Sequence, residues 1–262
     1  MRPLCEIPEE ICRQIQLVYS DIDDTMTTAG RIPAAAYTAI WRAHEAGLAV
    51  VPVTGRPAGW CDHIARMWPV AAVVGENGAL AFRLEGETMR RIWAPRQADA
   101  AARLERIQEQ VLREVPGCKV AADQPYRLYD LAIDIAEEVP RLDDAAIDRI
   151  VAIFTAHGAT AKVSSIHVNG WFGSYDKLTM CRRAAAELLG GELDPQRALF
   201  VGDSPNDVPM FRFFPHAVGV ANVGAWTHRM EALPSYVTDA AGGEGFAELV
   251  NTLLAGRTGG AT

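Results

Sequence analysis

The residues of this sequence that are best suited to chemistry lie in four short polar clusters. They are Asp21-Ile22-Asp23-Asp24-Thr25, Thr54-Gly55-Arg56, Lys177, and Gly202-Asp203-Ser204-Pro205-Asn206-Asp207. A single acidic residue after an apolar run is as often a helix cap or a turn residue, so no one cluster identifies a site. Several carboxylates brought to one place, however, repel one another unless a cation lies between them.

Together, these side chains predict a magnesium site that receives a phosphate group. Carboxylate oxygens are hard ligands, and Mg²⁺ usually keeps several waters and takes a phosphate oxygen as well. A lysine and a hydroxyl group at the same place suit the remaining phosphate oxygens. The clusters offer both, as Lys177 and Thr54.

The clusters can meet only if the elements that precede them form one sheet, and the apolar spacing predicts this arrangement. Short apolar runs predict strands at residues 17–20, 48–53, 70–74, 198–201 and 217–220. Helical spacing predicts helices at residues 33–46, from Pro57 onward, and at 177–189 and 245–254. This alternation favours an α/β fold with a Rossmann-like, doubly wound parallel sheet. Ligands bind beyond the carboxyl ends of such strands, where the clusters fall.

The regular alternation of predicted strands and helices stops in the middle part of the sequence. There the pattern predicts a hairpin of residues 79–84 and 88–93, helices at 98–114 and 143–157, and strands at 119–122, 128–135, 160–163 and 166–168. Apolar and polar residues alternate in the strand at 128–135, which predicts one exposed face. We therefore expect a core of residues 1–83 and 173–262 and an inserted α+β domain of residues 84–172.

Composition narrows the class of partner. The chain has 262 residues, 49% of them hydrophobic, and a net charge of −8, which disfavours nucleic acid as a partner. It has no apolar run of about 20 residues, so no membrane span is expected. Its five cysteines show no metal-binding spacing, and the first residues do not form a signal peptide. A cytoplasmic monomer or homodimer that acts on a small molecule is the expectation.

At the four clusters the sequence resembles the haloacid dehalogenase superfamily, whose four motifs occur in the same order. The resemblance covers the predicted core, about two thirds of the chain. Asp23 lies two residues after Asp21, the aspartate of the first motif. An acid at this position makes the motif similar to that of the phosphatases and phosphomutases, whereas the dehalogenases and ion-pumping ATPases lack it. Asp24 departs from the pattern, because glycine is commonest at that position. The insert resembles the cap of subfamily IIB, type C2B, found in Cof-type and sucrose-phosphatase-like enzymes.

The resemblance implies a role for each core residue. Asp21 would be the nucleophile, and Asp23 would protonate the leaving oxygen and then activate water. Thr54, Gly55, Lys177 and Asn206 would bind the phosphate group. The magnesium ligands would be Asp21, the backbone carbonyl of Asp23, Asp203 and Asp207. Arg56 is expected to brace its loop rather than to bind substrate.

The expected function is thus magnesium-dependent hydrolysis of a small phosphate monoester, such as a sugar or sugar-acid phosphate, through an aspartyl-phosphate. Asn77, His167 and Asn169 are candidates for substrate contacts from the insert and its junction. They could equally be turn or cross-strand residues. Two alternatives remain, a phosphomannomutase-like phosphohexomutase and a non-catalytic sugar-phosphate-binding protein. The mutase would need cap arginines for a second phosphate, and no such basic cluster is obvious.

Overall fold

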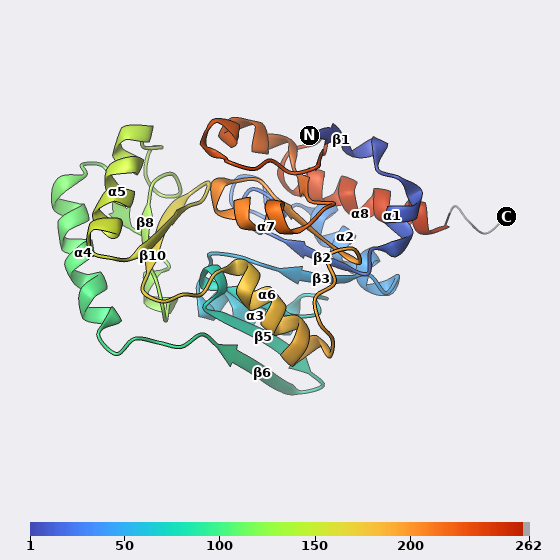
Figure 1. Ribbon diagram of the computed structural model, residues 1–262, viewed down its shortest axis with the longest axis horizontal. Coiled ribbons are helices and arrows are strands. Elements are labelled where there is room, and N and C mark those ends of the chain that lie inside the picture. Colours follow the sequence, from blue (N-terminus) through green and yellow to red (C-terminus); the bar gives the residue numbers. More distant parts are fainter. Residues whose placement is uncertain (259–262) are drawn as a thin grey trace.

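The core is built on a parallel sheet whose strands come from the first and the last part of the chain (Figure 1). The computed structural model describes residues 1–258. Six parallel strands lie in the order β1-β13-β12-β11-β2-β3. Their bounds are β1 Arg2–Pro3, β2 Leu17–Ser20, β3 Ala49–Pro52, β11 Ala198–Gly202, β12 Val218–Gly219 and β13 Tyr236–Val237. The predicted doubly wound α/β class is thereby confirmed.

A second, antiparallel sheet continues from the edge of the first. β4 (Val73–Gly75) follows β3 through one parallel bridge between Val53 and Val74. β5 (Leu80–Glu85) and β6 (Thr88–Trp93) then pair with it as an antiparallel hairpin. The hairpin is the one that the sequence predicts around residues 85–87.

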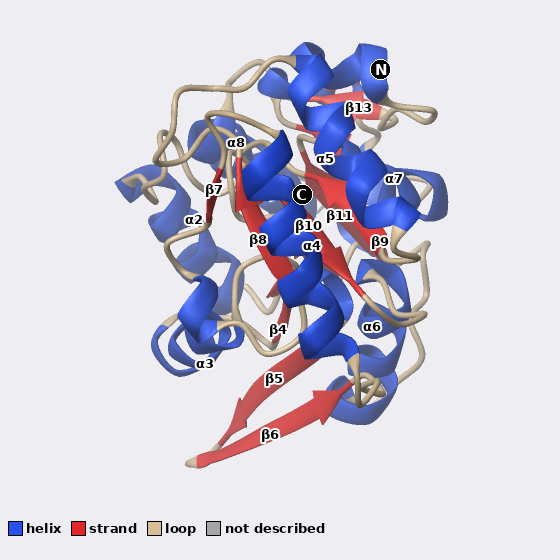
Figure 2. Cartoon of the chain, turned by 90° about the vertical axis from the view of Figure 1, so that its left-hand side faces the viewer, coloured by secondary structure: helices blue, strands red, loops and turns tan. Residues whose placement is uncertain are grey.

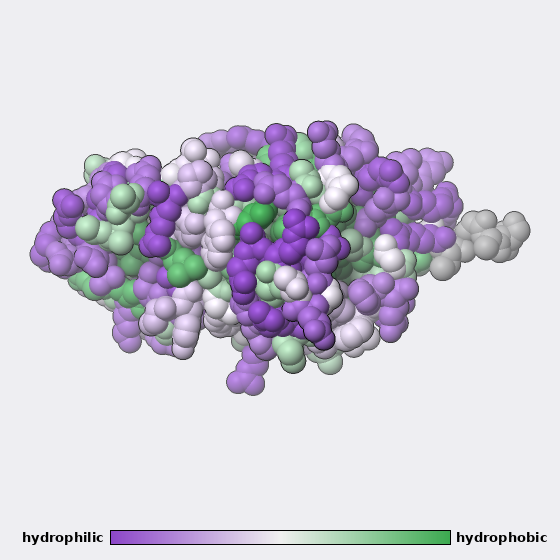
Figure 3. Space-filling model, turned by 90° about the horizontal axis from the view of Figure 1, so that it is seen from below, coloured by the Kyte–Doolittle hydropathy of each residue, from purple (hydrophilic) through white to green (hydrophobic). Residues whose placement is uncertain are grey.

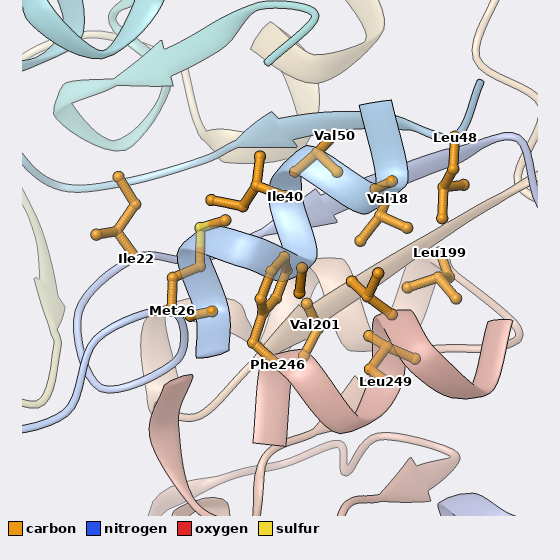
Figure 4. Packing of buried hydrophobic residues seen from close by; sticks show 14 of the residues in the cluster. Val18, Ile22, Met26, Ile40, Leu48, Val50, Leu199, Val201, Phe246 and Leu249 are labelled. Atoms are coloured by element: carbon orange, nitrogen blue, oxygen red, sulfur yellow. The ribbon is translucent and has the colours of Figure 1, made fainter. Parts of the chain in front are cut away.

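Helices cover both faces of the parallel sheet, because successive side chains of its strands point to opposite sides. One set packs with α1 (Glu9–Gln14), α2 (Ala34–Glu45), α3 (Ala58–Met67) and α8 (Gly242–Thr258), and comprises Val18, Val50 and Leu199. Figure 4 shows these three residues facing Ile40 of α2 and Leu249 of α8. The alternate set packs with α6 (Lys177–Ala184) and α7 (Val208–Phe213), and comprises Tyr19, Val51 and Phe200.

The insert has a sheet and an apolar core of its own. Its four antiparallel strands lie in the order β7-β8-β10-β9, with bounds β7 Lys119–Val120, β8 Leu131–Asp134, β9 Thr160–Val163 and β10 His167–Trp171. α4 (Ala100–Glu114) and α5 (Asp144–Ala156) cover its outer face, in front of β8 and β10 in Figure 2. Their apolar stripes close a cluster around Ile107, Ile150 and Val168.

The predicted exposed face of the strand at 128–135 is wrong. All four residues of β8 are buried. Leu131 and Ile133 pack under α4 and α5, and Ala132 and Asp134 on the opposite face are buried as well. The carboxylate of Asp134 is not solvated, because it accepts hydrogen bonds from the backbone N–H groups of Ala136, Glu137 and Glu138.

Among the strands and α-helices of residues 1–258, the short elements β1, α1 and β13 have no counterpart in the sequence prediction. β1 and β13 each have two residues, and they extend the parallel sheet by pairing with each other. α1 packs on α8. Strands and helices this short carry too little apolar periodicity to be recognised.

Gly78 shows how closely the core elements approach each other. Its φ is +103°, and a Cβ there would lie 2.0 Å from the carbonyl oxygen of Asp176, the residue that precedes α6. We expect Gly78→Ala to lower the free energy of unfolding by about 2 kcal/mol or more, because both the backbone and the contact would be strained. Denaturant unfolding measures this loss.

Gly86→Ala is the matched control for that substitution. Gly86 also has a positive φ, +59°, but nothing lies within 4 Å of its added Cβ. Gly86→Ala should therefore lower the free energy of unfolding through backbone strain alone, by about 1 kcal/mol. Equal losses for the two variants would show that the packing of Gly78 against Asp176 contributes nothing.

The surface agrees with the composition. Among residues 1–258, no helix is both long and apolar enough to cross a membrane. The face seen in Figure 3 is mostly hydrophilic, and its hydrophobic patches are small and separated.

Candidate active site

Three buried carboxylates meet beyond the carboxyl ends of two adjacent strands. β2 and β11 pair directly, and Asp21 and Asp203 are the first residues after them. Asp207 follows in the turn at Pro205–Asp207. One oxygen atom of each carboxylate lies within 4.8 Å of the others. The topology therefore brings together three of the predicted metal ligands.

Lys177 lies between two of these carboxylates. Its Nζ is 2.6 Å from Oδ1 of Asp21 and 2.7 Å from Oδ1 of Asp207. The lysine is the first residue of α6, whose N-terminus is capped by Asp176 accepting a hydrogen bond from the Thr179 N–H at 2.6 Å. The cap and the close contact with Gly78 hold this end of α6, and with it the ammonium group.

The charges of this cluster do not balance. Burial, together with the charges of Asp207 and Asp23, raises the pKa of Asp21 to about 8 against the opposing effect of Lys177. Burial and the charges of Asp21 and Asp207 also raise the pKa of Asp203. Burial lowers the pKa of Lys177, but the two carboxylates beside it outweigh burial and raise that pKa. Three carboxylates against one ammonium group suit a divalent cation, so the residues fit Mg²⁺.

The loop after β11 holds its two aspartates by local hydrogen bonds. Oδ2 of Asp207 accepts from the backbone N–H groups of Asp203 and Ser204, and Ser204 with Asp207 forms a capping box. A side chain at Gly202 would collide with Asp207, because a Cβ there would lie 2.3 Å from Oδ2. Asn206 accepts a hydrogen bond from the Ser204 hydroxyl at 2.9 Å and is buried.

Asn222 is a site residue that the sequence analysis missed. Its Nδ2 donates to Oδ2 of Asp203 at 3.2 Å and to the carbonyl oxygen of Asp24 at 2.9 Å. Its Oδ1 accepts from the N–H of Gly242, the first residue of α8. The residue joins the first-motif loop to the fourth. Its position shortly after the predicted strand at 217–220 is the signal that could have found it.

The carboxylate of Asp23 lies apart from the three-carboxylate group and is bound by Arg56. Nε of the arginine is 2.9 and 3.0 Å from the two carboxylate oxygens, and Nη2 is 2.8 Å from one of them. The same guanidinium contacts two acids of the insert, Asp123 at 3.3 Å and Glu137 at 2.6 Å. Arg56 therefore connects its own loop to the first-motif loop and to the insert.

Glu137 extends this network to a predicted substrate residue. Burial raises the pKa of its carboxyl group, but the contacts with His167 and Arg56 outweigh burial and lower it to about 2. Nε2 of His167 lies 2.8 Å from Oε2 of Glu137. His167 is buried, and Glu137 links it to Arg56 of the core.

Asn77 and Asn169 converge on Gly55 in the second-motif loop. A Cβ on Gly55 would lie 3.1 Å from Nδ2 of Asn77 and 3.4 Å from Oδ1 of Asn169. The Nδ2 group of Asn169 donates to Asp130 at 2.9 Å, whereas that of Asn77 is buried without a partner within residues 1–258. Thr54 is also buried, and its hydroxyl accepts the N–H of Arg56 at 3.0 Å. The predicted substrate asparagines thus lie against the predicted phosphate loop.

Glu76 is a second residue that the sequence analysis missed. Its carboxylate accepts hydrogen bonds from the N–H of Ala58, which begins α3, and from three successive N–H groups of the insert, those of Leu128, Tyr129 and Asp130. Burial and the nearby charge of Asp130 raise the pKa of its carboxyl group to about 7 against these hydrogen bonds. Glu76 therefore fixes the insert to the core beside Gly55.

A cleft of about 460 Å³ opens between the core and the insert. Its lining includes Asp23, Asp24 and Arg56 from the core and Glu137, Arg141 and Ser165 from the insert. Asn77, His167 and Asn169 do not line it. A molecule in the cleft would meet the carboxylate that the sequence analysis identifies as the general acid.

Comparison with known proteins places this geometry in a family. The family model of haloacid dehalogenase-like hydrolases matches residues 18–104. A phosphoglycolate phosphatase from Methanothrix thermoacetophila is 30% identical over 246 residues, which cover 92% of this chain and 98% of that protein.

Solved structures share the fold at lower identity. The Thermoplasma acidophilum protein 0175 is 19% identical with a TM-score of 0.70, and the match covers 92% of this chain and 98% of that one. Sucrose-phosphatase from Synechocystis, solved with sucrose and phosphate, is 16% identical with a TM-score of 0.63, over 92% and 98% of the two chains.

The resemblance predicted from the four motifs is thereby confirmed, while the predicted cap type stays a prediction. Three observations agree: the four polar clusters occur in family order, the parallel sheet brings the carboxylates of two of them together with Lys177, and a relative matches over nearly the whole length. The chain belongs to the haloacid dehalogenase-like hydrolases and is a phosphatase of that family.

Proposed function

We propose that the protein hydrolyses small phosphate monoesters in a magnesium-dependent reaction that passes through an aspartyl-phosphate at Asp21. The observation that carries this proposal is the position of Asp21, which contacts Lys177 at 2.6 Å and has a carboxylate oxygen within 4.8 Å of oxygens of Asp203 and Asp207. A carboxylate nucleophile can approach a phosphate group only where cationic charge offsets their repulsion. The buried cluster supplies one cation from the chain and a place for a second.

Asp21 and Lys177 act on the phosphoryl group. A free oxygen of Asp21 attacks phosphorus, the bond to the leaving oxygen breaks, and the acyl phosphate forms. Lys177 holds Asp21 by Oδ1 at 2.6 Å, which fixes the carboxylate and offsets negative charge as the phosphoryl group transfers. Thr54, Gly55 and Asn206 are the proposed further contacts of the phosphate oxygens.

Asp23 moves the protons. It protonates the leaving oxygen in the first step and takes a proton from the attacking water in the second. Three hydrogen bonds from Arg56 hold its carboxylate at the cleft. Arg56 is thus the proposed positioning residue for the general acid.

The proposed ligands of Mg²⁺ are Asp21, Asp203, Asp207 and the backbone carbonyl of Asp23. When bound, the ion neutralises charge between the nucleophile and the phosphate group. Asn222 and Thr25 orient Asp203 by hydrogen bonds of 3.2 and 3.3 Å to its two oxygens. The backbone N–H groups on Asp207 serve the same purpose.

Magnesium is expected to stabilise the protein as well as to support turnover. The ion relieves repulsion among buried carboxylates. At a concentration 100 times its Kd it raises the free energy of unfolding by about 2.7 kcal/mol. For a chain of this size that raises the Tm by about 5 °C or more. Ca²⁺ should also raise the Tm but support little activity, because its larger and looser coordination misplaces the nucleophile.

Thermal unfolding and phosphate release, each with Mg²⁺ and with excess chelator, test this expectation. Asp203→Asn is the matched variant, because its amide keeps the shape of the side chain but loses the charge. It should abolish the magnesium-dependent rise in Tm. Full activity in excess chelator would contradict the proposal.

The insert is proposed to act as a cap over the leaving group. Residues 84–172 are the proposed cap, and residues 1–83 and 173–262 the proposed core. The contacts of Glu76 and Arg56 with the insert support closure of this side of the site. A sugar or sugar-acid phosphate is the proposed substrate class. The relative named phosphoglycolate phosphatase supports a small acidic ester. Asn77, His167 and Asn169 stay predicted substrate residues.

A further inference from the structure

We propose that Arg141 and Ser165 form a subsite for a carboxylate on the leaving group, so that the preferred substrates are phosphate monoesters of hydroxy acids. This inference rests on the proposed function, because it identifies what that reaction releases. Both residues line the cleft of about 460 Å³ between the insert and the core. The opposite wall contains Asp23, the proposed general acid.

The position of Asp23 places the leaving group in this cleft. A general acid must lie within hydrogen-bond reach of the oxygen that it protonates. The atoms attached to that oxygen therefore extend into the space that Asp23 faces. Side chains on the insert side of the same space are the ones that meet the rest of the leaving group.

Arg141 is the cation in this cleft that has no acidic partner. Arg56 contacts three carboxylates, those of Asp23, Asp123 and Glu137. Arg141 instead lies over the ring of Trp226 at 4.5 Å and donates a long hydrogen bond, 3.4 Å, to the carbonyl oxygen of Ser165. Within residues 1–258 its guanidinium makes no ion pair, so its charge is available to a ligand.

The hydroxyl group of Ser165 is an independent sign of a ligand. The residue is only 5% exposed, and its Oγ has no hydrogen-bond partner among the described residues. The neighbouring Ser164 stabilises the same turn, with its Oγ accepting the N–H of His167 at 3.0 Å. Ser165 makes no such contact. A buried hydroxyl without a partner is costly, and a bound acceptor at the cleft would satisfy it.

The charges of the cleft favour a carboxylate over a second phosphate group. Glu137 contacts Arg56 and His167, and Asp23 contacts Arg56, so neither acid forms an ion pair with Arg141. Asp24 also lines the cleft, and its negative charge disfavours a dianionic second phosphate group more than a carboxylate of charge −1. One arginine and one hydroxyl then remain for the ligand, which suits a planar group of charge −1 that can be held at both oxygens.

The test compares phosphate monoesters whose leaving groups differ in charge. The matched pair is phosphoglycolate and 2-hydroxyethyl phosphate, whose leaving group is uncharged; 1,3-propanediol bisphosphate and p-nitrophenyl phosphate are measured beside them, each with Mg²⁺. We expect the wild type to prefer phosphoglycolate over 2-hydroxyethyl phosphate by about 30-fold in kcat/KM. Arg141→Ala should remove most of that preference and change kcat/KM for the two uncharged leaving groups by less than about 3-fold.

Two further variants and one binding measurement separate this role from a structural one. Ser165→Ala should lower kcat/KM for phosphoglycolate by about 5- to 10-fold, as the loss of one hydrogen bond does. Arg113→Ala, on the exposed face of α4, should change nothing. Glycolate, the released acid, should raise the Tm of the wild type but not that of Arg141→Ala.

Equal losses on all esters in Arg141→Ala, or a wild-type preference for 2-hydroxyethyl phosphate, would overturn the subsite. A preference for the bisphosphate would overturn the assignment to a carboxylate. Failure to release phosphate from any ester, p-nitrophenyl phosphate included, would instead overturn the proposed function. Glycolate binding that depends on Arg141 would then still support the anion subsite.

Discussion

Replacing Asp21 by asparagine is expected to abolish turnover while the fold is kept. The amide has the shape of the carboxylate, and its carbonyl oxygen can still accept the hydrogen bond that Lys177 donates at 2.6 Å. An amide cannot form an acyl phosphate, so the covalent route is closed. Phosphate release should fall by about 1,000-fold or more, as it does when a nucleophile is removed from a covalent catalyst.

The control for this variant is Asp24→Asn. It makes the same chemical change in the same loop, and asparagine tolerates the positive φ of +55° at that position. We expect Asp24→Asn to retain activity within about tenfold of the wild type. Activity of Asp21→Asn within tenfold of the wild type would refute the assignment of the nucleophile.

Replacing Lys177 by methionine is expected to have the largest effect on stability. The lysine is buried and contacts two buried carboxylates at 2.6 and 2.7 Å. Its removal leaves three carboxylates without the ammonium group that offsets them, and breaking one side of a buried ion pair costs about 3–5 kcal/mol. The metal-free variant should therefore unfold at a much lower denaturant concentration, and its activity should be lost as well.

Lys119→Met provides the comparison, because Lys119 is exposed on β7, an edge strand of the insert's sheet. It should change the free energy of unfolding by less than about 0.5 kcal/mol. Mg²⁺ should restore part of the stability of Lys177→Met, because both cations offset the same carboxylates. A stability of Lys177→Met equal to that of the wild type would mean that the two ion pairs do not hold the cluster together.

The core of the site could be predicted from sequence because its residues are tied to local patterns. Asp21 and Asp203 each follow an apolar run, and parallel strands bring their ends together. Lys177 is the first residue of the helix that the sequence predicts at 177–189. The side chains of Asp21, Lys177 and Asp207 therefore meet where strand order and helix starts require.

The contacts between core and insert could not be predicted, because they depend on how two separate units pack. Arg56 was expected to brace its loop, but its partners Asp123 and Glu137 lie 67 and 81 residues further along the chain. Glu76 resembles an ordinary turn residue in sequence, and only the packed structure brings backbone N–H groups of the insert to it. No periodicity marks such positions.

The prediction that one face of β8 is exposed is wrong for a related reason. The alternation at 128–135 indicates the inner and outer side chains of one strand, but not what covers the second face. Asp134 looks like a solvated residue, yet the turn that follows supplies three N–H groups to its carboxylate.

The central claim, that the phosphoryl group passes through Asp21, is tested most directly by quenching the reaction in acid within the first turnover. The wild type is mixed with excess substrate and Mg²⁺, quenched and digested, and the masses of its peptides are measured. We predict a phosphoryl group on the peptide that contains Asp21, and a burst of released leaving group that precedes inorganic phosphate. The account would be contradicted if leaving group and inorganic phosphate appeared together from the start with no phosphorylated peptide. A phosphoryl group on a residue other than Asp21 would contradict it as well.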